Sequence, residues 1–250
     1  MHESHSGAGA PCEPDLPPYQ AVLTETDWGS LRTPFGNGNG EDIPEVLARL
    51  LAPDPGIQVA ALSELFETVN HQNSIHEATA PAALYVAGIL THPAAANLRA
   101  YRNIPIRATL SNSLASVAYD ASDETVGRIE RYFPGSLTPG TTMAAFRGLR
   151  PTLYRAVAPF LRDGHEDVRE AAVVAALILA EHPALAEHRD HLAVHARRVL
   201  DTSGHGPDRR VAWNALAAWG HDVPGPEPFR EEPWNCGPHS DGRGDLEPPF

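Results

Sequence analysis

The chain contains no lysine, and all 19 of its basic residues are arginines. Without a lysine amine, neither Schiff-base catalysis nor a lysine-containing phosphate loop is possible, so both classes of site are excluded. The 32 acidic residues leave a formal net charge of −13 at pH 7. Nonspecific nucleic-acid binding depends on neutralising phosphates. The charge balance therefore argues against tight, nonspecific nucleic-acid binding and suits either solubility or a basic protein partner.

Cysteine is also scarce, with two residues, Cys12 and Cys236, in opposite terminal segments. Neither has a second cysteine nearby to give metal-ligand spacing, so we expect free thiols. The uninterrupted apolar run Ala171–Ala180 is too short to cross a bilayer, which needs about 20 residues. The N-terminus lacks the basic start and apolar core of a signal peptide. We therefore expect a cytoplasmic protein that does not enter a membrane.

The common catalytic motifs are missing as well. The sequence has no HExxH, GxSxG, CxxC or phosphate-binding loop. Catalytic groups can still meet only in space, so this absence does not exclude an enzyme. It leads us to expect no cofactor and no catalytic residue.

The chain divides into two tails and a helical middle. Residues 1–22 and 221–250 are rich in glycine, proline and acidic side chains, which predicts disorder. Between them, residues 23–220 repeatedly show apolar residues at helical spacing. The sequence predicts an all-α domain there.

The most informative stretch is Pro159–Ala180. The end of one helix is followed by a polar break that contains Asp163, and a second helix starts at Glu166. The second helix is apolar on every side, so other helices must cover it completely. Many of its residues are alanines, which allow those neighbours to approach closely. This stretch is one layer of a stack of helix pairs.

The order of residues in this stretch resembles the HEAT repeat, as in bacterial HEAT-repeat proteins. The resemblance rests on Leu161, Asp163, Val168, Arg169, Ala172 and Ala176. Asp163 is expected to accept hydrogen bonds from backbone N–H groups of the turn, and Arg169 to reach back to such a carboxylate. The resemblance implies an α-α superhelix, a solenoid of antiparallel helix pairs that offers a long surface to another macromolecule.

Other helices repeat parts of this pattern. Ile57-Gln58 opens a helix that we expect over Ile57–Asn70, and Ile106-Arg107 lies in one expected over Ile104–Ala121. Asp42 and Glu45 have the spacing of a capping box before another helix.

Candidate binding residues come from two places. If the second helix of each pair lines the concave side, Glu64, Glu67, Asn112 and Tyr119 lie in a groove. His71, Gln72 and His76 belong to a polar link between two helices at the rim of the stack, where functional residues are common. Asn112 and Tyr119 belong to an uncharged polar face that also includes Ser111 and Ser113. The alternative is that these residues form ordinary solvated faces and a loop that satisfies helix ends.

Three histidines, His188, His191 and His195, share one helix face and are weak candidates for metal ligands. A polar face is the simpler interpretation, because no HExxH or cysteine pair supports a metal site. Trp213 and Trp219 are similarly expected to be core and capping residues.

Two functions remain. The first is a non-catalytic binding or scaffold protein, for example an antagonist of a basic protein partner. The alternative is an enzyme like the DNA glycosylases that resemble this fold and cradle damaged DNA in a concave surface with tryptophan and aspartate residues. That enzyme would need a basic groove, for which the candidates are Arg99, Arg102, Arg107, Arg147, Arg150 and Arg155.

Overall fold

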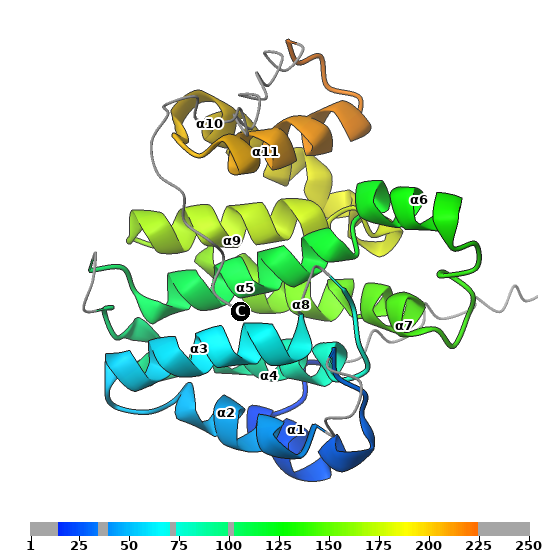
Figure 1. Ribbon diagram of the computed structural model, residues 1–250. Helices are drawn as coiled ribbons and strands as arrows, with labels where there is room; N and C mark the ends of the chain where they lie inside the picture. Colours follow the sequence, from blue (N-terminus) through cyan, green and yellow to red (C-terminus); the bar gives the residue numbers. More distant parts are fainter. Residues whose placement is uncertain (1–14, 35–39, 71–73, 100–102, 225–250) are drawn as a thin grey trace, which may run out of the picture.

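The computed structural model describes residues 15–34, 40–70, 74–99 and 103–224 (Figure 1). These ranges are all-α, as the sequence predicts, and contain no strand, only isolated bridge residues such as the pair Leu98 and Pro105. No helix within them combines the length and apolar character needed to cross a membrane. Both cysteines lie outside the described residues.

The first half of the fold contains five α-helices. They are α1 (Tyr19–Glu25), α2 (Ile43–Arg49), α3 (Pro55–Val69), α4 (Thr79–Ile89) and α5 (Ile106–Asp120). The second half contains α6 (Asp123–Tyr132), α7 (Thr142–Gly148), α8 (Arg150–Val157), α9 (Glu166–Leu179), α10 (Arg189–Thr202) and α11 (Gly206–Ala218). Short 3-10 helices connect them: η1 (Trp28–Ser30), η2 (Gly40–Asp42), η4 (Pro93–Ala96), η5 (Ala158–Arg162) and η6 (Pro183–His188).

Helix α9 lies at the centre of the packing, as its apolar composition predicts. Every residue of its run from Ala171 to Leu179 is buried. Its most extensive contact is with α5, and it also packs against α8, α10, α11 and η5. Along the molecule α3 contacts α5, α5 contacts α9 and α9 contacts α11, so these four helices follow one another in layers (Figure 1).

The same side-chain interaction recurs in three of these layers. Near its start, each of α3, α5 and α9 carries a polar side chain that donates to the C-cap carbonyl of the preceding helix. The three bonds are Gln58 Nε2 to Leu50 O, Arg107 Nε to Leu90 O and Arg169 Nη1 to Asp163 O, each 2.7 Å long. Each bond satisfies a carbonyl that a helix end leaves without an intrahelical partner.

The predicted turn at Asp163 is partly correct. Its carboxylate accepts from the backbone N–H of His165 at 2.8 Å, as expected. Arg169, however, donates to the backbone carbonyl of Asp163 and not to a carboxylate, so that prediction is wrong.

Two predictions near the N-terminus also need correction. Helix α1 begins at Tyr19, inside the stretch predicted to be disordered, and the Tyr19 ring packs edge-on against Tyr85 with centroids 5.7 Å apart. Asp42 forms no side-chain capping bond. Its backbone has helical angles because it closes η2, whereas a capping residue needs an extended backbone.

Candidate binding surface and cleft

Of the predicted groove residues on α3 and α5, Glu64, Glu67 and Asn112 are exposed, whereas Tyr119 is partly buried. Glu64 forms an ion pair with Arg49 at 2.6 Å, so much of its charge is compensated. Ser111 and Ser113, by contrast, are buried, which narrows the predicted polar face of α5. Helix α5 is covered by α3, α4 and α9, and the small serine side chains fit between them.

The predicted polar link between α3 and α4 forms hydrogen bonds with the ends of these two helices. His71 and Gln72 lie outside the described residues. The His76 ring nitrogen Nε2 is 2.6 Å from Ser74 Oγ, and the His76 backbone N–H donates to Thr79 Oγ1 at 2.9 Å. Thr79 Oγ1 in turn donates to the carbonyl of Val69 at 2.5 Å. These bonds join the end of α3 to the start of α4.

The acidic excess is concentrated in the first half of the fold. Described residues up to 120 include eleven acidic residues and four arginines. We define the acidic patch as Asp27, Glu41, Asp42 and Glu45, which are exposed on η1, η2 and α2 and form no ion pair within the described residues. The carboxylates of Asp27 and Glu41 both lie near Gly29. A Cβ atom placed on Gly29 would be 3.6 Å from Glu41 Oε1 and 4.0 Å from Asp27 Oδ1, so the two carboxylates are close to each other.

A cleft of about 440 Å³ opens where α5, α9 and α11 end. Six residues give it its chemical character: the aromatic side chains of Tyr119, Trp213 and Trp219, and the carboxylates of Asp123, Glu124 and Glu181. We call this the aromatic–acidic cleft. Of the predicted binding residues, only Tyr119 lines it, and the two tryptophans form its wall while remaining partly exposed.

Hydrogen bonds fix the orientation of the Tyr119 and Trp213 side chains in the cleft wall. Arg210 Nη2 donates to Tyr119 Oη at 3.1 Å, with the guanidinium carbon 6.0 Å from the tyrosine ring centroid. Trp213 Nε1 donates to the carbonyl of Pro224 at 2.8 Å. Glu124 Oε2 accepts from the Asn214 amide at 3.2 Å. The lining is therefore partly ordered before any ligand arrives.

A buried arginine supports the cleft at α8. Arg150 is fully buried, and its Nη2 donates to the carbonyl of Ala121 and lies 3.3 Å from Glu181 Oε2. Arg147 donates to the same carbonyl and pairs with Asp123, whose N–H donates to Glu181 at 2.8 Å. Burial raises the pKa of the Glu181 carboxyl, which the positive charge of Arg150 opposes. The cluster joins the ends of α5 and α9 to the starts of α6 and α8.

Four of the six arginines proposed for a basic groove have partners elsewhere: Arg107, Arg147, Arg150 and Arg155. Arg107 donates to a helix-end carbonyl and lies 4.9 Å from the Phe160 ring centroid. Arg147 and Arg150 belong to the buried cluster, and Arg155 lies 3.7 Å from Asp15. Arg102 lies outside the described residues. The prediction that these residues line a basic groove is therefore wrong for Arg107, Arg147 and Arg150.

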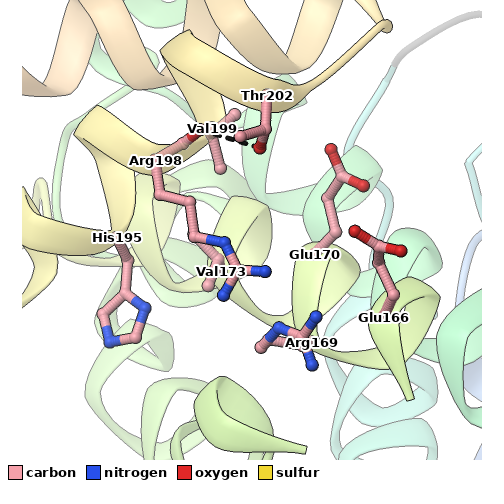
Figure 2. A pocket seen from close by; sticks show the side chains of 8 residues that line it. All are labelled: Glu166, Arg169, Glu170, Val173, His195, Arg198, Val199 and Thr202. Atoms are coloured by element: carbon pink, nitrogen blue, oxygen red, sulfur yellow. Dashed lines mark hydrogen bonds between the residues drawn. The ribbon is translucent and has the colours of Figure 1, made fainter. Parts of the chain in front are cut away.

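A second, smaller hollow lies between α9 and α10 (Figure 2). Glu166, Arg169 and Glu170 face His195 and Arg198 across a volume of about 30 Å³. That volume is the share of one water molecule in the liquid, so the hollow is too small for an organic ligand. Burial, together with nearby positive groups, lowers the pKa of His195.

The three histidines on η6 and α10 do not converge on one point. The His188 ring stacks on Tyr154, with centroids 4.7 Å apart. His191 and His195 instead contact each other edge-to-face, with centroids 5.0 Å apart. Among the described residues, no three histidine, cysteine, aspartate or glutamate side chains are arranged to hold a metal ion.

Asp120, at the end of α5, is a buried carboxyl group that pairs with the side chain of Asn70. Asn70 Nδ2 donates to Asp120 Oδ2 at 2.8 Å, while Asn70 Oδ1 has no hydrogen-bond partner within the described residues. Burial raises the pKa of Asp120, although the bond from Asn70 opposes this shift. A raised carboxyl pKa in the folded state means that stability is lost as the pH rises through that pKa.

We therefore expect Asp120→Asn to stabilise the protein at neutral pH. The new amide keeps the acceptor for Asn70 and adds a donor for Asn70 Oδ1, a gain of roughly 1 kcal/mol. The gain corresponds to about 2–4 °C in Tm at pH 7 and should shrink as the pH falls, because the wild-type carboxyl then becomes protonated. Thermal melts of Asp120→Asn and of the exposed control Asp201→Asn across this pH range test it. A lower Tm for Asp120→Asn at pH 7 would contradict the expectation.

Most of the cleft residues were missed from the sequence. Asp123 and Glu124 are the first residues of α6, and Glu181 follows the C-cap of α9. At such positions no periodic pattern distinguishes a functional carboxylate from an ordinary charge near a helix end. The two tryptophans were identified, but were interpreted as core and capping residues. Comparison of the chain with protein-family models, curated proteins and solved structures found no match.

Proposed function

We propose that this protein is a non-catalytic binding protein that presents a HEAT-like helical surface to a basic protein partner. The observation that carries the proposal is the acidic patch, whose four carboxylates lack arginine partners within the described residues. Exposed charges of one sign attract a partner of opposite charge and raise its association rate. The engaged arginines weigh against the alternative, an enzyme acting on DNA.

The HEAT-like superhelix is part of this proposal. Two observations support it: the layered order of α3, α5, α9 and α11, and the recurring bond to a C-cap carbonyl. Two helices, α6 and α7, interrupt the alternation between α5 and α8.

To test this proposal, the partner is first captured from a native lysate. The rate at which it associates with this protein is then measured. Replacing Glu41 and Glu45 with glutamine should lower that rate at least threefold at low ionic strength. The difference should shrink as salt is added, because exposed charges are screened over about 8 Å at physiological ionic strength.

The matched control removes two negative charges from the second half, through Glu187→Gln with Asp201→Asn. This control should leave the association rate nearly unchanged. Equal effects of the two double variants would show that total charge, and not the acidic patch, drives association. Tight binding of the wild type to duplex DNA at physiological salt would favour the enzyme instead.

A further inference from the structure

The C-terminal ends of α5, α9 and α11 meet at the aromatic–acidic cleft, beside the first turn of α6. Tyr119 lies in the last turn of α5, Ile178 in that of α9, and Trp219 is the C-cap of α11. Each helix C-terminus carries roughly half a negative charge, which favours a nearby cation. The chain already places Arg189 at one of these ends, where it donates to the carbonyls of Ala180 and Glu181 at 3.1 Å.

One carboxylate of the cleft remains without a cationic partner. Asp123 pairs with Arg147, and Glu181 pairs with Arg150. Glu124 is exposed and accepts only from the neutral Asn214 amide among the described residues. Its negative charge is therefore available to a ligand in the cleft.

The aromatic lining suits a cation that has an apolar stem. Tryptophan and tyrosine rings attract guanidinium and ammonium groups through their electron-rich faces. The contact of Arg210 with Tyr119 is an example within this cleft wall. The bond from Trp213 to Pro224 fixes the orientation of one indole before binding. The volume of about 440 Å³ lies in the range of small-ligand sites.

We propose that the aromatic–acidic cleft binds an organic cation, a guanidinium or ammonium group on an apolar stem, supplied by an arginine side chain of the protein partner. The inference deepens the proposed function and rests on it for the source of the cation. Glu124 pairs with the charged group, while Trp213, Trp219 and Tyr119 enclose the stem.

The test is isothermal titration of the full chain with a short peptide that carries one central arginine. The matched peptide has citrulline, which keeps the shape of arginine but removes its charge. We expect the arginine peptide to bind at least tenfold more tightly, a difference of about 1.4 kcal/mol. Glu124→Gln should weaken the arginine peptide by a similar factor, whereas Glu170→Gln, at the small hollow, should not change it.

Free argininamide provides a second arm that identifies the source of the cation. Weaker binding of argininamide than of the peptide supports a protein side chain as the ligand. Equally tight binding of argininamide would overturn that source. Equal affinities for the arginine and citrulline peptides, or no effect of Glu124→Gln, would overturn the cation site itself. The acidic-patch experiment is independent of these titrations, so failure of one proposal can be told from failure of the other.

Discussion

Replacing Arg150 with methionine should lower the free energy of unfolding by about 3–5 kcal/mol, because it leaves a partly buried carboxylate without its cation. Glu181 would keep only the N–H of Asp123 as a partner in the cluster. For a chain of this size, the loss corresponds to about 6–20 °C in Tm. Thermal or denaturant unfolding at pH 7 measures it, and Arg162→Met, at an exposed position, is the control.

The Arg150→Met variant should also respond to pH in a defined direction. Burial already raises the pKa of Glu181, and losing the attraction of Arg150 raises it further. A carboxyl with a raised folded-state pKa loses stability as the pH rises. The deficit of the variant should therefore be smallest in acid, where Glu181 is neutral, and largest at pH 7 and above.

A double variant separates the charge from the packing. Arg150→Met with Glu181→Gln removes both charges, so it should recover part of the stability lost in the single variant. If the double variant is as unstable as Arg150→Met alone, the loss comes from packing around the arginine and not from the unpaired carboxylate.

The second large effect concerns the centre of α9. Ala176 is fully buried in the helix that packs most extensively on α5. Enlarging it to leucine overpacks a site with no free side and should cost about 1–3 kcal/mol. The expected fall in Tm is about 2–12 °C. The same substitution at Ala217, an exposed residue of α11, should change Tm little.

These two alanine variants test the burial of α9 directly. The two melting curves are compared under identical conditions, and only the difference between them matters. If Ala176→Leu and Ala217→Leu have equal Tm values, α9 has space beside it and is not the packed centre of the fold.

Local sequence signals predicted α9 well and α5 less well. The apolar run and the turn at Asp163 define α9 within the chain itself. The helix expected over Ile104–Ala121 starts later, at Ile106, and Asn103 before it adopts a left-handed backbone with φ of 53°. The N–H of Ile106 donates to the carbonyl of Asn97 at 2.7 Å. That start depends on a chain reversal, which helical periodicity does not encode.

The cleft could not be predicted for a related reason. Its lining comes from residues as far apart as Tyr119 and Trp219, which meet only because three helices end at the same place. The sequence identified the aromatic residues and the arginines separately. It could not show that the Arg150 side chain is buried in the core while the Glu124 side chain is exposed.

The recurring bonds from Gln58, Arg107 and Arg169 have a consequence for how the sequence of this protein can evolve. Their acceptors are backbone carbonyls, which every residue type provides. Each bond therefore constrains one residue and leaves the residue at the acceptor position free to vary. Among sequences descended from a common ancestor with this chain, the donor positions should be retained alone, and no pairwise co-variation should reveal these joints between helices.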